Sequence, residues 1–211
     1  MTLAVLAAPR VSAHRLDEYL QAARISLGPD RVEIELDLTP GMALADAIAR
    51  EIDRDGTGAI SSDEGAAYAE AVRHVLHLDI DGTPIAPELV DRRFPTPEAM
   101  HGGEGTIRLR LTAALPRLAA GPHELRYRNG HHPDIGVYLA NALVPASSRV
   151  VVTAQQRDVD QRELTIAYVL HPEPALGTRL WLLGAVTLML ALVFVLRRRQ
   201  ARALSSTAGR R

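Results

Sequence analysis

The sequence predicts a mainly β fold, an antiparallel β-sandwich with an inserted helix–loop–helix and one C-terminal transmembrane helix. Three observations lead to this prediction. Several short segments alternate apolar and polar residues, as half-buried strands do. Residues 42–75 break that alternation and are rich in Ala, which favours helix. A long uncharged stretch near the C-terminus has the composition of a membrane span.

The first thirteen residues are typical of an export signal. Residues 2–9 are apolar, and the small-residue pattern Val11-Ser12-Ala13 is of the kind that signal peptidase cleaves. We therefore interpret residues 1–13 as a signal peptide, with the mature chain beginning at His14. An apolar N-terminal strand is the alternative interpretation.

The clearest strand covers residues 31–38, where Val32, Ile34, Leu36 and Leu38 face one way and charged residues face the other. Asp81-Gly82 is typical of a hairpin turn. Further strands are predicted at residues 19–27, 76–80, 83–85, 106–111, 124–128, 136–142, 149–153 and 163–170. Pro and Gly punctuate the spaces between them, so residues 14–170 are expected to form an extracytoplasmic sandwich.

The Ala-rich insert is expected to contain two helices, at residues 42–52 and 62–75, on either side of a compact acidic turn. This helix–loop–helix is placed between two strands of the sandwich.

The C-terminal part is expected to tether the domain to a membrane. Residues 171–179 are a Pro-containing linker, and residues 180–196 are uncharged over about 25 Å of helix, near the lower limit for spanning a bilayer. Arginines follow in residues 197–211, and such clusters mark the cytoplasmic side. The expectation is a single-pass protein of the bacterial cell membrane, with a periplasmic body and a cytoplasmic tail. A buried core helix is the alternative for 180–196.

Composition excludes several classes of function. The chain has no cysteine, which excludes disulfides, thiolate zinc sites and a cysteine nucleophile. All 25 acidic residues lie in residues 14–179, and an acidic body does not suit nucleic acid. Ser147-Ser148 belongs to no recognisable nucleophile motif, and we expect no enzyme activity.

The acidic turn carries the most specific motif. Its twelve residues run from Asp53 to Glu64 and resemble the calcium loop of the EF-hand family. The resemblance implies that side chains at positions 1, 3, 5, 9 and 12 and a carbonyl at position 7 supply oxygens to Ca²⁺, with glycine at position 6. The implied ligands are Asp53, Asp55, Thr57, Ala59, Ser61 and Glu64. The alternative is a solvated acidic turn whose Glu64 belongs to a helix capping box.

Two departures from the family pattern indicate a weak site. Position 5 is Thr57, so only three ligands carry formal charge, and no second hand follows in the sequence. We therefore expect affinity on the order of millimolar and a structural or interaction role.

Histidines suggest a second function. His131-His132 stand in a loop, His74 and His77 are three residues apart, and His14 would become the N-terminus. A transition-metal site needs three or four converging ligands, which a sequence does not show.

Several phrases together resemble the periplasmic domain that precedes the membrane bundle in some bacterial nickel/cobalt permeases of the hydrogenase-accessory type. They are residues 12–16, residues 30–38, the acidic loop and residues 78–84. The resemblance implies, as the alternative function, an accessory of a nickel, cobalt or copper transport system. A single membrane helix would not form a transport pathway, so transport itself is not implied.

Overall fold

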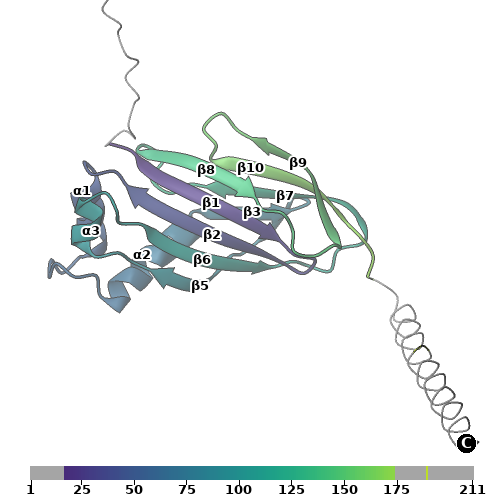
Figure 1. The fold of residues 1–211 in the computed structure, drawn as a ribbon, viewed down its shortest axis with the longest axis horizontal. Coiled ribbons are helices and arrows are strands. Elements are labelled where there is room, and N and C mark those ends of the chain that lie inside the picture. The colour runs from purple at the N-terminus through teal and green to yellow at the C-terminus, as the bar shows by residue number, and fades with distance from the viewer. Residues whose placement is uncertain (1–16, 174–188, 190–211) are drawn as a thin grey trace, which may run out of the picture. The chain divides into compact units, whose positions relative to one another are not determined.

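The computed structural model describes residues 17–173 and residue 189 of the 211-residue chain. Ten strands in this part form two five-stranded sheets (Figure 1). Sheet 1 contains, in order, β5 (Glu88–Arg93), β6 (Ile107–Ala114), β2 (Arg31–Pro40), β1 (Tyr19–Leu27) and β8 (Gly136–Ala142). Sheet 2 contains β4 (Thr83–Ile85), β3 (Leu76–Ile80), β7 (Gly121–Asn129), β10 (Glu163–Leu170) and β9 (Val150–Arg157).

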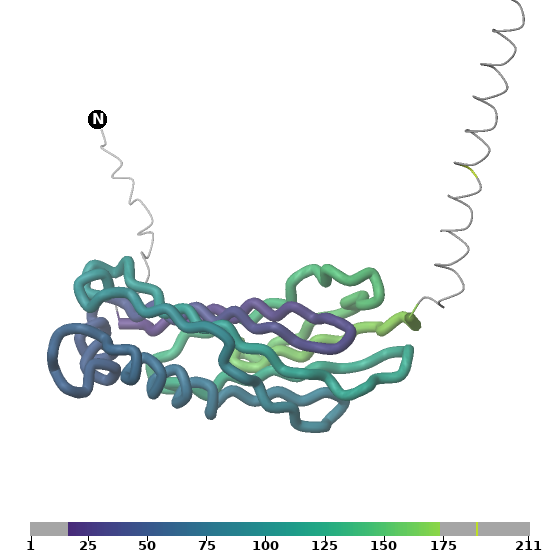
Figure 2. Tube along the Cα trace, turned by 90° about the horizontal axis from the view of Figure 1, so that it is seen from below, coloured from purple at the N-terminus to yellow at the C-terminus, as the bar shows by residue number. Residues whose placement is uncertain are grey.

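The two sheets form the two layers of a sandwich around one core (Figure 2). On β1 and β2 every second residue is buried, and residues from the inner faces of both sheets belong to a single apolar cluster. Alternation places these side chains on one face, which explains the burial. The predicted β-rich fold is therefore confirmed. All recorded strand pairs are antiparallel except β1 with β8, which run parallel with Tyr19 opposite Gly136.

The hairpin predicted at Asp81-Gly82 is present between β3 and β4. Both residues have positive φ, 50° and 78°, as the two central positions of a type I′ turn require.

Three helices lie at one end of the sandwich (Figures 1 and 2). The insert predicted at residues 42–75 contains α1 (Ala45–Ile52) and α2 (Ser62–His74), and a short α3 (Pro97–His101) packs against α1. Helix α2 contacts β5 and β3, with Tyr68 edge-on to Phe94. The helix–loop–helix is thus an integral part of the folded domain.

The prediction of a single-pass membrane protein is contradicted by the structure. In residues 17–173 and 189, no helix is long and apolar enough to cross a bilayer. The helices within 17–173 have 8, 13 and 5 residues, whereas a span needs about 20. The expected span at 180–196 lies outside the described residues apart from Met189, as do the signal peptide at 1–13, the tail at 197–211 and most of the linker at 171–179.

Candidate metal-binding loop

The acidic loop joins the end of α1 to the start of α2. Asp53 is the C-terminal cap of α1, and Ser61 is the N-terminal cap of α2. Between them Gly56 and Gly58 adopt φ of 68° and 77°, the left-handed region that residues with a Cβ rarely enter. The sharp turn expected at Gly58 is therefore present, and it folds the loop back over its own acidic side chains.

Three carboxylates converge inside the loop. One oxygen each from Asp53, Asp55 and Glu64 lies within 4.8 Å of the other two. Two oxygens bound to one Ca²⁺ at about 2.3–2.6 Å can lie at most about 5 Å apart, so this spacing fits one shared ion. Of the groups of His, Asp and Glu in the described part of the chain, this is the one that could hold a metal.

Backbone amides hold the two aspartates in place. Asp53 Oδ2 accepts a hydrogen bond from the Gly58 N–H at 2.8 Å, and Asp53 Oδ1 accepts one from Thr57 at 3.1 Å. Asp55 Oδ1 accepts from the same Thr57 N–H at 3.1 Å. Because one amide serves two carboxylates, both side chains face the interior of the loop.

Glu64 joins the two ends of the loop. Its Oε2 accepts from the backbone N–H of Ser61 at 2.9 Å and from the Ser61 hydroxyl at 2.7 Å. Its Oε1 accepts from the N–H of Arg54 at 2.8 Å and, more weakly, from that of Asp55 at 3.3 Å. The bonds from Ser61, followed by those from Asp55 and Arg54, lower the pKa of Glu64 to about 2, so the side chain is an anion at neutral pH.

The remaining predicted ligands, Thr57, Ala59 and Ser61, form hydrogen bonds within the loop. The Thr57 hydroxyl donates to the carbonyl of Ala59 at 3.3 Å, so these two oxygens lie together. The Ser61 hydroxyl also accepts from the Glu64 N–H at 3.3 Å, which completes a capping box. The capping box weighed as the alternative from the sequence is thus present, alongside the carboxylate cluster.

Polar contacts of Tyr68 and Glu51 attach the insert to the sandwich, and the sequence did not predict them. The hydroxyl of Tyr68 on α2 lies 2.8 Å from that of Tyr19 on β1 and 3.0 Å from Nε2 of His131. Glu51 on α1 lies 3.0 Å from Nε2 of His132. The one signal in the sequence is a tyrosine on the apolar face of α2, Tyr68, because a buried hydroxyl needs a hydrogen-bond partner. That signal does not say which residue the partner is.

Two histidines, His131 and His132, take part in these contacts between the insert and the sandwich. His131 is buried, and this burial lowers its pKa to about 4, so it is neutral where it meets Tyr68. His74 and His77 are exposed, and His14 lies outside the described residues. No group of three potential ligands within residues 17–173 includes a histidine.

Comparison with known proteins adds no relative: no family model, no curated protein and no solved structure matches the chain. The resemblance to the nickel/cobalt permease domain therefore stays a prediction.

Proposed function

We propose that this chain is a calcium-binding β-sandwich module in which one ion, held by the loop from Asp53 to Glu64, stabilises the helical insert. The observation that carries the proposal is the convergence of the Asp53, Asp55 and Glu64 carboxylates within 4.8 Å. Calcium prefers such hard oxygen ligands and accepts an irregular shell of six to eight of them. The Thr57 hydroxyl, the Ala59 carbonyl and water complete that shell.

A capping box alone does not account for the position of Glu64. The box needs one carboxylate oxygen near the Ser61 amide, and Oε2 meets that need. Oε1 instead accepts from the Arg54 amide at the other end of the loop, and one oxygen of the Glu64 carboxylate lies within 4.8 Å of the two aspartates. Without a cation, three like charges this close repel each other, so a bound cation offsets an electrostatic cost.

The proposed role is structural and does not include catalysis. The loop ends both helices of the insert, and those helices are joined to the sandwich through Tyr68 and Glu51. An ion that fixes the loop therefore also fixes the relative position of α1 and α2. The module would then present the rest of its surface to a partner in a calcium-dependent way.

The second function, transition-metal binding through histidine, is not favoured by any observation in the described part of the chain. His131 and His132 have ring centroids 4.2 Å apart, but their outer nitrogens are used by Tyr68 and Glu51. Calcium is therefore the ion that the proposal names.

A thermal-shift panel on the full chain tests the proposal. Calcium should raise the melting temperature, because a ligand that binds only the folded state stabilises it by mass action. The free energy of unfolding should rise by about 2.7 kcal/mol at a calcium concentration one hundred times the dissociation constant. Magnesium should do so poorly, since it demands tighter octahedral geometry, and nickel should have no specific effect.

Asp63→Asn is the matched control for Glu64→Gln in the same panel. Asp63 is an exposed acid beside Glu64, and its side chain forms no hydrogen bond or ion pair with the residues that the structure describes. Glu64→Gln should abolish most of the calcium-dependent shift, whereas Asp63→Asn should keep it. Equal shifts in both variants would show that calcium acts through general screening, and the site would then be wrong.

A further inference from the structure

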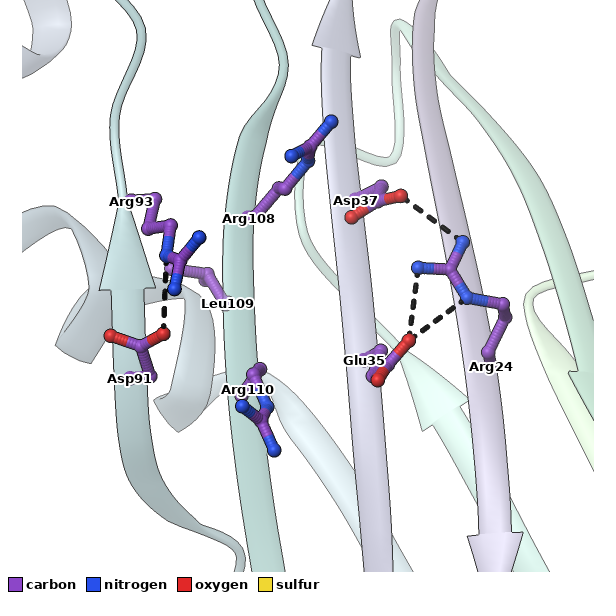
Figure 3. A pocket seen from close by; sticks show the side chains of 8 residues that line it. All are labelled: Arg24, Glu35, Asp37, Asp91, Arg93, Arg108, Leu109 and Arg110. Atoms are coloured by element: carbon purple, nitrogen blue, oxygen red, sulfur yellow. Dashed lines mark hydrogen bonds and ion pairs between the residues drawn. The ribbon is translucent and has the colours of Figure 1, made fainter.

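The outer face of sheet 1 has a groove of about 300 Å³ that crosses β5, β6, β2 and β1 (Figure 3). Its walls are almost entirely charged. Four arginines (Arg24, Arg93, Arg108 and Arg110) face three acids (Glu35, Asp37 and Asp91), with Leu109 at the base.

The acids of the groove are committed to two of the four arginines. Glu35 and Asp37 on β2 are each 3.1 Å from the guanidinium of Arg24 on β1. Asp91 lies 3.4 Å from Nε of Arg93 on the same strand. Figure 3 shows the acids of β2 turned toward Arg24 and away from β6.

Arg108 and Arg110 are left without an acidic partner. Strand pairing puts Asp37 and Glu35 directly opposite them, yet neither guanidinium group forms a hydrogen bond or ion pair with any of residues 17–173. Arg108 also lies opposite Arg93 on β5, a cross-strand pair of like charge, which is unfavourable. With four arginines against three acids, the lining has a net formal charge of one positive unit, and the guanidinium groups without a bonded acid are those of Arg108 and Arg110.

The other sheet shows that this is a property of the site and not of arginines on strands. Arg126 and Arg128 on β7 have the same spacing and the same outward orientation. Each has a partner, because Arg126 lies 2.7 Å from Glu124 and Arg128 lies 3.3 Å from Glu163. Two arginine pairs of identical spacing thus differ in whether an acid neutralises them.

We propose that the groove is a binding site for a small multivalent oxyanion of the phosphate type, held by Arg108 and Arg110 with Arg93 on the opposite wall. A guanidinium presents a planar fork of donors that matches phosphate oxygens and binds them with charge-assisted hydrogen bonds. The anion would neutralise Arg108 and Arg110, just as Glu35 and Asp37 neutralise Arg24. The groove is open, so binding is weak and falls with ionic strength. This site is separate from the acidic loop and does not rest on calcium binding.

The test is a calorimetric titration of the full chain with inorganic phosphate, at constant ionic strength and without added calcium. Saturable binding to the wild type is expected. The double variant Arg108→Gln/Arg110→Gln should bind roughly tenfold more weakly or worse, because charge-assisted bonds are lost. The matched double variant Arg126→Gln/Arg128→Gln should bind like the wild type. Both double variants should melt cooperatively, which shows that they are folded.

Three results would overturn the proposal. The first is equal weakening in both double variants, and the second is no saturable binding in the wild type, since attraction would then be non-specific. The third comes from a parallel measurement with vesicles containing phosphatidic acid. Binding to vesicles without binding of free phosphate would assign the arginines to a lipid surface and not to a small anion. Binding of free phosphate that the vesicles do not compete away supports the small-anion site.

Discussion

The carboxylate of Glu64 accepts a hydrogen bond from the backbone amide of Arg54, ten residues earlier, at 2.8 Å. This contact joins the two ends of the acidic loop. It involves Oε1, whereas the capping box uses Oε2, which accepts from Ser61. One side chain therefore starts α2 and holds the beginning of the loop beside its end.

Glu64→Gln should separate these two tasks. Gln still caps α2 through its carbonyl oxygen, but its amide nitrogen donates and does not accept from Arg54. We expect a modest loss of stability without calcium and a much larger loss of the stability that calcium adds. Urea unfolding with and without calcium measures both. If the calcium-dependent gain were the same as in the wild type, Glu64 would not be a ligand.

Gly58→Ala should destabilise the loop although there is room for a methyl group. A Cβ at Gly58 would meet no atom within 4 Å, but the backbone has φ of 77°, where a Cβ costs about 1–2 kcal/mol. Calcium affinity should fall as well, because the Gly58 amide holds Asp53.

Gly102→Ala is the control for that variant, because Gly102 has φ of −73° and its Cβ would make only ordinary contacts. Its effect on thermal unfolding should stay within a few tenths of a kcal/mol or be slightly stabilising. Similar losses in both variants would contradict the role of the left-handed backbone.

Tyr68→Phe tests the contact between the insert and the sandwich. The change removes the hydroxyl that Tyr19 and His131 share and leaves two buried polar groups with fewer partners. We expect a loss of about 1–3 kcal/mol in chemical unfolding.

Tyr127→Phe provides the comparison, because the buried Tyr127 hydroxyl has no hydrogen-bond partner among the described residues. Removing an unsatisfied hydroxyl should be neutral or stabilising. Should Tyr127→Phe cost as much as Tyr68→Phe, the Tyr68 contacts would not be what stabilises the insert.

His123 should make stability depend on pH. Its Nδ1 lies 2.7 Å from Asp81 and its Nε2 lies 2.8 Å from the carbonyl of Ala119, so both nitrogens donate in the charged form. Burial opposes that charge, but the bonds to Ala119 and Asp81 prevail and raise the pKa of His123. Burial likewise works against the Asp81 charge, yet the Glu124 amide and His123 lower the pKa of Asp81.

The pair therefore contributes fully between roughly pH 4 and 6.5, the ordinary values of the two groups. Its contribution is lost as pH rises through the raised pKa of His123 or falls through the lowered pKa of Asp81. Urea unfolding at pH 5.5 and 8.5 should show a larger drop for the wild type than for His123→Gln. An equal drop in both proteins would contradict the charged pair.

Local patterns in the sequence were sufficient for much of the fold. Alternation identified β2, β3 and β6, and the Asp81-Gly82 turn identified the hairpin, because each signal lies within a few residues. Strand β5 was missed because it is an edge strand with an irregularity between Leu89 and Asp91, so its burial does not alternate cleanly. Helix α3 has only five residues, too few for a helical period to show.

The site was predictable only as far as its contacts are local. The Asp53–Glu64 spacing located the three carboxylates that the structure brings together. Contacts between distant segments were not readable, such as the parallel pairing of β1 with β8 or Tyr68 with His131, 63 residues apart. Arg108 is unpaired because the neighbouring Asp37 forms its ion pair with Arg24 instead. The sequence does not show which of the two arginines Asp37 will contact.

Calorimetric titration of the full chain with calcium tests the central claim most directly. We expect one saturable site with a dissociation constant on the order of millimolar, consistent with three charged ligands. Asp53→Asn should weaken it strongly, since that side chain lies in the carboxylate cluster and is fixed by Gly58. No heat of binding at millimolar calcium, together with an unchanged melting temperature, would contradict the account and leave the loop as a capped acidic turn.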